Sequence, residues 1–441
     1  MKLSFSISII ICISLFACKS RPITIGTESS KSINIGKSIR IDSTQFGFGV
    51  CEPSICISPV NTNYIAAASI LNWSYTSTDG GRNWTKTALS SSMGVYGDPV
   101  VRIDNDGIIY YSHLSNPDAA PYRSESFLDR IVVQRSIDNG ASWNDGSHPA
   151  IRGKKDQDKQ WMAIDPRNNH LFMTWTEFDK YGSDDPEDKS RILFSKSLDQ
   201  GLTWTEPLPI SQFEGDCIDD DMTTEGAVPA VGPNGELYVS WAFNEKIYFD
   251  KSFDGGQTWM KEDKVIAQQP GGWSFDIPGI SRCNGMPITD VDISNGPNKG
   301  TIYVNWSDQK NGPDDTDVWL ISSRDQGKTW TNPIRVNTDA AGKQQFFCWM
   351  DIDQSSGNIS IVFYDRREYI DEQTDVYLAH STDGGQSFTN HKINQESFKP
   401  NPNVFFGDYN DISTVNGQIR PIWTQNEGME LSVWTAIISE N

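Results

Sequence analysis

The sequence predicts an all-β fold, a β-propeller built from four-stranded blades, and two observations carry that prediction. First, the pattern Ser-x-Asp-x-Gly-x-x-Trp occurs six times, with Phe388 in place of Trp in the last copy. Second, the copies lie 55 to 71 residues apart, and each interval repeats the same succession of short apolar strands. A repeat of this length with one group of strands per period is typical of propeller blades.

Each copy of the motif is expected to form the turn between the third and fourth strands of a blade. An Asp side chain accepts hydrogen bonds from backbone N–H groups just ahead of it, and the Gly two residues later supplies a positive φ. The Trp would cover the turn. We therefore assign a structural role to the motif aspartates, which are Asp79, Asp138, Asp199, Asp254, Asp325 and Asp383.

The number of blades follows from the inner strands, of which the sequence contains seven. They begin near Glu52, Asp98, Gln160, Ala227, Pro287, Cys348 and Gly407. The seventh unit ends before a fourth strand, and residues 33–41 form a spare strand at the other end of the chain. Pairing the two would leave no exposed edge, so we expect seven blades closed by the N-terminal strand. A six-bladed ring with one irregular unit is the alternative.

The N-terminal segment differs in kind from the rest of the chain. Residues 1–17 combine Lys2 with an apolar run, the pattern of a secretory signal peptide and too short for a comfortable membrane span. Residues 18–32 are polar and are expected to form a flexible tether that begins with Cys18. Residues 33–441 are then a single propeller domain with all six motifs. Export permits disulfides, and Cys217 with Cys283 is one candidate pair.

Composition limits the partners of the protein. The 441 residues include 58 acidic and 37 basic side chains, and the net charge of −21 argues against a nucleic-acid partner. The acidic runs 184–188 and 314–317 offer oxygen ligands of the kind that calcium prefers, without the spacing of an EF-hand. We predict no cofactor and no metal centre, and keep a structural calcium ion as an option. The oligomeric state is left open.

The repeated motif resembles the Asp-box, or bacterial neuraminidase repeat, of sialidase-like β-propellers. Leu15-Phe16-Ala17-Cys18 in turn resembles a bacterial lipobox. The second resemblance implies cleavage before Cys18 and a lipid on its thiol, hence a lipoprotein of the bacterial cell envelope, anchored at the outer membrane or the cell surface. An ordinary signal peptide cut near the same place is the alternative. The first resemblance implies a glycan or glycoconjugate as partner.

The candidate site lies on the face opposite the Asp-boxes, where loops lead into the inner strands and join second to third strands. These loops are rich in acids, amides and aromatic rings, a combination that suits sugar recognition. We predict catalytic roles for Tyr409, Asp408, Asp351 and Glu225. We predict substrate-binding roles for Arg282, Arg366, Arg367, Trp161, Trp349, Glu52 and Asp98.

The resemblance to sialidases is incomplete at the positions that carry their chemistry. Sialidases hold the substrate carboxylate with three Arg, and they use a Tyr nucleophile and an Asp acid/base. Here Cys51-Glu52-Pro53 stands where the first Arg is expected, and Ile70-Leu71-Asn72-Trp73 lacks the carboxylate. The sequence thus predicts glycoside-hydrolase-like action on glycans, with an exo-sialidase as one form of it. A non-catalytic glycan- or protein-binding propeller is the alternative.

Overall fold

The computed structural model describes residues 32–45, 49–117, 119, 124 and 126–441, and residues 32–441 form one compact unit. The described part consists of strands, turns and loops, and none of it is a helix long and apolar enough to cross a membrane. The predicted signal peptide, the lipidation site Cys18 and the tether up to residue 31 lie outside the described residues.

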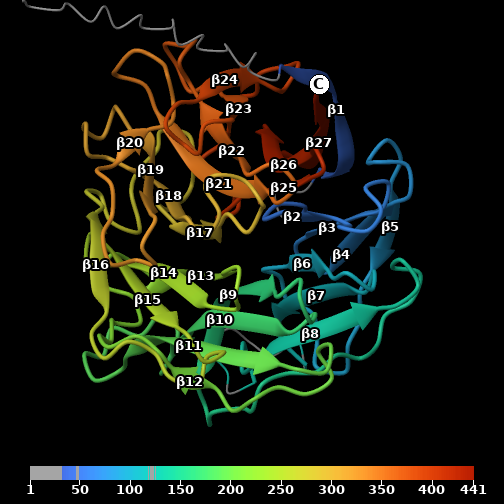
Figure 1. Ribbon diagram of the computed structural model, residues 1–441, viewed down its shortest axis with the longest axis vertical. Coiled ribbons are helices and arrows are strands. Elements are labelled where there is room, and N and C mark those ends of the chain that lie inside the picture. The colour runs from blue at the N-terminus through green and yellow to red at the C-terminus, as the bar shows by residue number, and fades with distance from the viewer. Residues whose placement is uncertain (1–31, 46–48, 118, 120–123, 125) are drawn as a thin grey trace, which may run out of the picture. The chain divides into compact units, whose positions relative to one another are not determined.

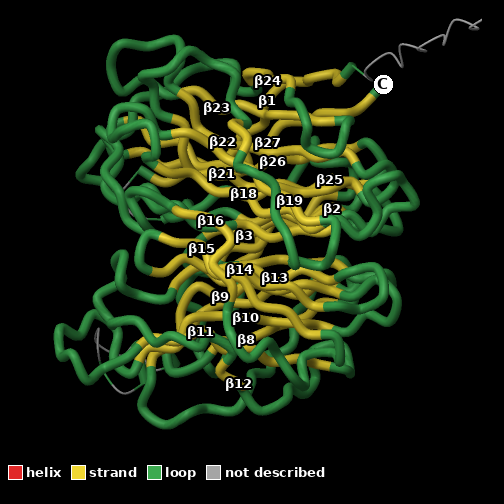
Figure 2. The backbone as a smooth tube through the Cα atoms, turned by 60° about the vertical axis from the view of Figure 1, so that its left-hand side comes forward, coloured by secondary structure: helices red, strands yellow, loops and turns green. Residues whose placement is uncertain are grey.

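Seven antiparallel sheets surround a common axis, and each sheet is one blade (Figure 1). The strands run between two sets of loops, one on each face of the ring (Figure 2). The prediction of seven blades is confirmed, and the six-bladed alternative is wrong.

The first strand of each blade lies innermost and the fourth outermost. The inner strands are β2 (Ser54–Ile57), β6 (Val100–Ile103), β9 (Asp156–Ile164), β13 (Glu225–Val231), β17 (Ile288–Val291), β21 (Gln345–Asp353) and β25 (Asp411–Val415). The second strands are β3 (Ile65–Ser69), β7 (Ile109–Leu114), β10 (Leu171–Phe178), β14 (Leu237–Phe243), β18 (Ile302–Asp308), β22 (Asn358–Asp365) and β26 (Gln418–Glu427).

The outer half of the blades is less regular. The third strands are β4 (Trp73–Ser77), β8 (Ile131–Ser136), β11 (Ser190–Ser197), β15 (Lys246–Ser252), β19 (Asp317–Ser323), β23 (Asp375–Ser381) and β27 (Glu430–Glu440). The fourth strands are β5 (Thr85–Ala88), β12 (Leu208–Pro209), β16 (Lys264–Gln268), β20 (Ile334–Arg335), β24 (Thr389–Lys392) and, for the last blade, β1 (Ile33–Thr44). In the described part of the second blade, a single bridge from Val133 to Ser147 takes the place of a fourth strand.

The N-terminal strand closes the ring as predicted. β1 pairs antiparallel with β27 from Ile33 opposite Glu440 to Thr44 opposite Leu431, and Asn441 donates its backbone N–H to the Ser32 carbonyl at 3.0 Å. In Figure 1 the blue β1 accordingly lies beside the red β27. Because β1 covers the outer edge of the last blade, that edge cannot pair with another chain.

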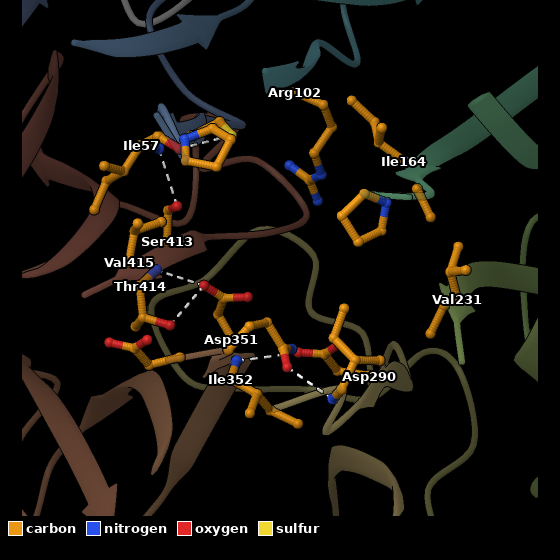
Figure 3. Close-up of a pocket in the computed structure, with 18 of the residues that line it drawn as sticks. Ile57, Arg102, Ile164, Val231, Asp290, Asp351, Ile352, Ser413, Thr414 and Val415 are labelled. Atoms are coloured by element: carbon orange, nitrogen blue, oxygen red, sulfur yellow. Dashed lines mark hydrogen bonds between the residues drawn. The ribbon is translucent and has the colours of Figure 1, made fainter. Parts of the chain in front are cut away.

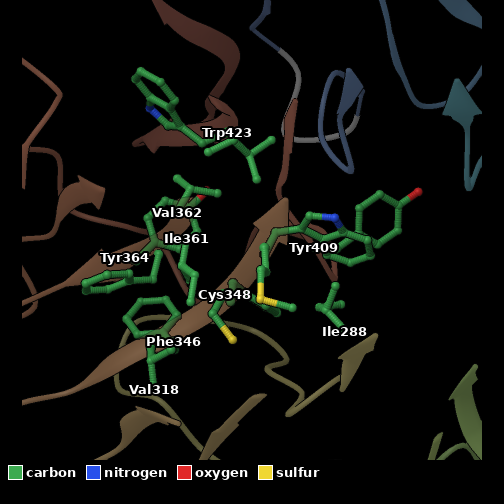
Figure 4. Packing of buried hydrophobic residues seen from close by; sticks show 14 of the residues in the cluster. Ile288, Val318, Phe346, Cys348, Ile361, Val362, Tyr364, Tyr409 and Trp423 are labelled. Carbon is green, nitrogen blue, oxygen red and sulfur yellow. The ribbon is translucent and has the colours of Figure 1, made fainter. Parts of the chain in front are cut away.

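The blades are held together by apolar side chains that fill the space between neighbouring sheets. Every residue of β10 and β14 is buried, because each of these sheets has a blade on both of its faces. Figure 4 shows one such region, where Val318 of the fifth blade, Phe346 and Ile361 of the sixth and Trp423 of the seventh belong to one cluster.

The Asp-boxes form the turns expected of them. In the fourth blade, Oδ1 of Asp254 accepts hydrogen bonds from the backbone N–H groups of Gln257 and Thr258, both at 2.9 Å. The hydroxyl of Ser252 donates to the same oxygen at 2.8 Å and accepts from the Gly256 N–H at 2.9 Å. Gly256 has φ of 81°, and a Cβ there would lie 2.3 Å from the ring of Phe194 in the preceding blade. The turn therefore requires glycine both for its backbone angle and for blade packing.

Candidate functional site

Three inner strands carry a β-bulge near their first residues, on the face opposite the Asp-boxes. In β9 the residues Lys159 and Gln160 together oppose one residue of β10, and Lys159 has φ of 53°. The corresponding bulges in β13 and β21 place Gly226 at φ of 72° and Phe347 at φ of 49°. Positive φ is unfavourable for Lys and Phe. Bulges are common next to functional sites, where they change the direction in which a side chain points. The three bulges therefore mark a candidate functional site.

The first bulge aims a buried lysine at two carboxylates from other blades. Nζ of Lys159 lies 3.1 Å from Oδ2 of Asp98 and 2.8 Å from Oδ2 of Asp408. The Lys159 side chain is only 4% exposed. Burial lowers the pKa of Lys159, but Asp158, Asp408 and Asp98 hold it well above its usual value. The lysine therefore stays charged and joins the third blade to the starts of the second and seventh blades.

An arginine completes the same network from the loop that leads into the fifth blade. Arg282 donates from Nε to Oδ1 of Asp408 at 2.8 Å and from Nη2 to its other oxygen. Its Nη1 donates to Oδ2 of Asp219 at 3.0 Å, and the hydroxyl of Tyr181 donates to the same oxygen at 2.7 Å. The Arg282 side chain is 37% exposed and lies over the ring of Phe405 at 5.4 Å. Arg282 is thus the member through which the network reaches the surface.

We call these residues the charge cluster. Its members are Glu52, Asp98, Asp158, Lys159, Asp219, Glu225, Arg282 and Asp408.

The surroundings of the charge cluster drive the pKa values of its carboxyl groups Asp158 and Asp408 apart. Burial alone would raise the pKa of Asp408, but Arg282 and Lys159 hold it well below its usual range. Burial, with Asp98 and Asp219 nearby, raises the pKa of Asp158 to about 8. Burial also raises the pKa of Glu52, where Asp98 and Asp408 are close, and that of Glu225, where Asp219 and Asp158 are close. Near neutral pH the cluster therefore holds an ionised Asp408 beside an Asp158 that keeps its proton.

Glu225 is the most enclosed of these acids. It is fully buried, and its Oε2 accepts a hydrogen bond from the Thr176 hydroxyl at 3.2 Å. Its Oε1 has no hydrogen-bond partner among the described residues. A buried polar atom without a partner is unfavourable in a purely structural role.

An aromatic layer lies beneath the charge cluster. The rings of Trp161 and Trp349 are 4.1 Å apart between centroids, and Tyr409 meets Trp161 edge-on at 5.2 Å. The hydroxyl of Tyr409 donates to the Pro99 carbonyl at 3.5 Å, and all three rings are buried. Figure 4 shows Tyr409 among these packed side chains. The structure thus buries Tyr409, which was predicted to be catalytic, together with Trp161 and Trp349, which were predicted to bind substrate.

Asp351 lies on the other side of this aromatic layer. It follows Trp349 in β21, and its Oδ2 accepts a hydrogen bond from the Thr414 hydroxyl at 2.8 Å. Its near neighbours are Asp290 and Arg102. Asp351 therefore does not join Asp408 and Glu225, as the sequence had suggested. The reason is the direction of the strand, because Asp351 is four residues beyond the bulge at Phe347.

The three arginines predicted to bind substrate, Arg282, Arg366 and Arg367, have different partners. Arg366 is buried over the ring of Phe346 at 5.2 Å, whereas Arg367 donates to Oδ2 of Asp365 at 2.8 Å. Of the three, only Arg282 belongs to the charge cluster. The predicted residues that the structure does bring together are Glu52, Asp98, Glu225, Arg282 and Asp408.

Sequence reasoning did not single out Lys159, Asp219 or Tyr181 as site residues. Asp219 and Tyr181 are in loops that were expected on this face, but nothing in their sequence indicates the contact between them. Lys159 follows two acids, Asp156 and Asp158, and precedes Gln160, a pattern typical of a solvated polar run. The sequence signal that could have identified Lys159 is its position two residues before Trp161 in an inner strand.

Two subsidiary predictions concern cysteines and metal. The five described cysteines, including Cys217 and Cys283, are all free thiols, so the suggested disulfide is wrong. Among the residues that the structure describes, no group of three acids, histidines or cysteines is arranged to hold a metal ion. Asp317 of the acidic run 314–317 instead accepts hydrogen bonds from Asn337 and Asn311, both at 2.6 Å.

No family model matches the chain. Many solved structures are similar to it, and three of them illustrate the likeness. An ulvan lyase of polysaccharide lyase family PL25, bound to -[GlcA(1-4)Rha3S]-, has a TM-score of 0.55 at 13% identity, covering 89% of this chain and 95% of its own. The NanB sialidase from Streptococcus pneumoniae has a TM-score of 0.51 at 9% identity, with 92% and 94% covered. A protein of unknown function from Dyadobacter fermentans DSM 18053 has a TM-score of 0.51 at 14% identity, with 93% and 99% covered.

These likenesses extend over nearly the whole propeller, so the chain shares the fold of sialidase-like β-propellers. At such low identity the activity has to be argued from the site.

Proposed function

We propose that this protein is a glycan-acting enzyme of glycoside hydrolase type, with its chemistry at the charge cluster. The observation that carries the proposal is the pairing of an ionised Asp408 with the neutral carboxyl of Asp158 around Lys159 and Arg282. Carboxyl groups whose environments drive their pKa values apart are the usual acid and base of glycosidases. The fold shared with a sialidase and a polysaccharide lyase supports a saccharide substrate.

The arrangement suggests a role for each group. Asp158, which retains its proton near neutral pH, would protonate the oxygen of the leaving group. Asp408 would stabilise positive charge that develops on the sugar ring, because its own charge is maintained by two cations. Arg282 and Tyr181, at the surface of the cluster, would donate hydrogen bonds to sugar hydroxyls. Glu225 would keep the floor of the site neutral.

The substrate we favour lacks a carboxylate at this position. Lys159 and Arg282 are both engaged by carboxylates of the protein, and Arg366 and Arg367 lie elsewhere. A sialic acid would have to displace Asp408 or Asp219 from Arg282. A neutral sugar needs no such exchange, so we rank an exo-sialidase below a hydrolase of neutral glycans.

The test is release of sugar from a panel of neutral and sialylated glycans, followed by mass spectrometry. We expect release from neutral glycans, and a loss of about a hundredfold or more in Asp158→Asn. The same variant should lose less activity on an aryl glycoside, whose leaving group needs no proton. Asp250→Asn is the matched control, because Asp250 is also buried with a raised pKa of about 7 but lies in β15, away from the cluster. An equal loss on both substrates, or full activity in Asp158→Asn, would refute the assignment.

A second function is favoured by the burial of the cluster. Asp408 and Lys159 are 2% and 4% exposed, and Arg282 covers them. A non-catalytic, glycan-binding propeller would present such a closed surface. Binding on a glycan array with no release across the panel would select this function, and Arg282→Ala should then weaken the binding.

The location we propose is the bacterial cell envelope, through a lipid on Cys18. This rests on the lipobox-like sequence Leu15-Phe16-Ala17-Cys18. Metabolic labelling with a fatty-acid analogue should mark the wild-type protein in bacteria and not Cys18→Ala. Label that persists in the variant would contradict a lipid at this residue.

A further inference from the structure

A cavity lies at the other end of the central channel, on the Asp-box face. Its volume is about 550 Å³, and all seven inner strands contribute to its wall. The turns that follow these strands, at Pro59, Asn105 and Pro166 among others, form its rim. Trp349 of the aromatic layer contributes to its lining and separates it from the charge cluster. This volume falls in the range of sites for small organic molecules.

The wall of this cavity is mainly aliphatic. Figure 3 shows Ile57, Ile164, Val231, Ile352 and Val415 around the open space. Apolar walls with a few fixed polar groups are typical of ligand pockets. The apolar body of a ligand would therefore be accommodated by side chains from five different blades.

One cation and four carboxyl groups line the same space: Arg102, Asp104, Asp290, Asp351 and Asp353. Arg102 extends from β6 into the cavity, where its Nη1 lies 3.4 Å from Oδ2 of Asp411 (Figure 3). Asp290 and Asp351 lie side by side on β17 and β21, since Oδ2 of Asp290 accepts the N–H of Ile352 at 3.1 Å. Among the described residues that line the cavity, Arg102 is thus the single cation, and it already pairs with Asp411.

The ionisation of Asp290 and Asp351 depends on whether a positive charge lies between their carboxyl groups. Burial raises the pKa of Asp290 to about 7, and burial together with Asp290 raises the pKa of Asp351 well above its usual value. Neighbouring buried carboxyl groups cannot both ionise easily unless a positive charge joins them. Because the hydrogen bonds from Thr414 go to Oδ2 of Asp351, its other oxygen remains directed toward the open space in Figure 3.

We propose that this cavity binds a small organic cation, a primary amine with an apolar body, whose ammonium group lies against Asp351 and Asp290. The aliphatic wall contacts the apolar body of the ligand. The two carboxylates accept hydrogen bonds from the ammonium group and balance its positive charge. A bare divalent ion would require more oxygen ligands than two carboxylates and would leave the aliphatic wall without a partner. The proposal is independent of the glycan site, from which the aromatic layer separates it.

The experiment is calorimetric titration of the full chain with phenethylamine. Two ligands with the same body serve as controls, 2-phenylethanol without the charge and phenylacetate with the opposite charge. We expect the amine to bind at least tenfold more tightly than either control. Asp351→Asn and Asp290→Asn should each weaken the amine at least tenfold, since Asn keeps the acceptor oxygen but not the charge. Asp250→Asn, a buried acid outside the cavity, should bind like the wild type.

Three results would overturn the proposal: equal binding of the amine and the alcohol, no binding of the amine, or wild-type affinity in Asp351→Asn. If the acid variants do not fold, Val231→Phe tests the site without altering charge, because its ring would occupy the cavity. Amine binding that survives this change would place the ligand elsewhere. Asp158→Asn should bind the amine normally, so failure here and failure of the proposed hydrolase are distinguishable.

Discussion

The two ends of the central channel are built from the same inner strands but differ in geometry and chemistry. At the end opposite the Asp-boxes, β9, β13 and β21 are bulged and hold a closed network of paired charges. At the Asp-box end the strands are regular, and their side chains surround a cavity of about 550 Å³. Trp161, Trp349 and Tyr409 separate the two ends.

This difference shows how one strand can serve two environments. A bulge inserts a residue and turns a side chain, such as that of Lys159, toward the axis, where it meets acids from other blades. Beyond the bulge the ordinary alternation resumes and places branched aliphatic residues on the cavity wall. We therefore expect substitutions at the charged end to lower the free energy of unfolding more than substitutions at the apolar end.

The largest effect should come from removing the lysine that joins the paired charges. Lys159→Met keeps the length of the side chain but leaves Asp98 and Asp408 buried with one cation fewer. Breaking a buried ion pair in this way costs about 3–5 kcal/mol in the free energy of unfolding, measured by urea denaturation. The control is Lys399→Met, which removes an exposed ion pair with Glu372 and should change little. Similar small losses in both variants would mean that the cluster is not a stabilising centre.

The next largest effect is expected in the aromatic layer that separates the two ends of the channel. Trp161 is 1% exposed and stacks on Trp349. Trp161→Ala should lower the free energy of unfolding by about 3 kcal/mol, because it leaves a cavity between the two ends. Trp161→Phe should retain much of the stability, which urea denaturation of both variants would show. If Trp161→Ala were no less stable than Trp161→Phe, the two ends would not depend on this layer for their separation.

The pH dependence of stability distinguishes the acids of the charge cluster. The pKa of Asp158 is about 8 in the folded protein and about 4 in an unfolded chain. Its contribution to stability is thus present in full below pH ~4 and is lost as the pH rises toward 8. Asp158→Asn removes this titration and should flatten the decline of the unfolding free energy between pH 5 and pH 8. Parallel pH profiles for the variant and the wild type would show that Asp158 is not the group that titrates.

The sequence predicted the parts of this molecule that are set locally. The Asp-box places Ser, Asp and Gly within five residues of one another, so the turn can be recognised without the rest of the chain, and its repetition gives the blades. The unpaired strand at 33–41 was then expected to complete the seventh blade. The Asp-box recurs because successive blades need the same turn between their third and fourth strands.

The charge cluster was only partly predictable, because its contacts join residues far apart in the sequence. Lys159 and Asp408 are far apart in the sequence, and the bulge that orients Lys159 has no glycine to mark it. Periodicity places Asp351 on an inner strand but does not say on which side of Trp349 its carboxyl lies. Candidate residues could thus be identified by type and loop, while their division between the two ends of the channel needed the structure.

The smallest effect is expected at the Asp-boxes, whose acids serve single turns. Asp254→Ala removes two backbone hydrogen bonds and the contact with the Thr258 hydroxyl, all within the turn. A loss of about 1 kcal/mol in the free energy of unfolding is expected from such local bonds, measured by urea denaturation. Asp184→Ala, at an exposed acid between β10 and β11, is the control and should have no effect. Neither sugar release nor amine binding should change in Asp254→Ala, because this acid touches neither end of the channel. A change in either activity would mean that the turn positions the inner strands, and that the two ends depend on the outer blades.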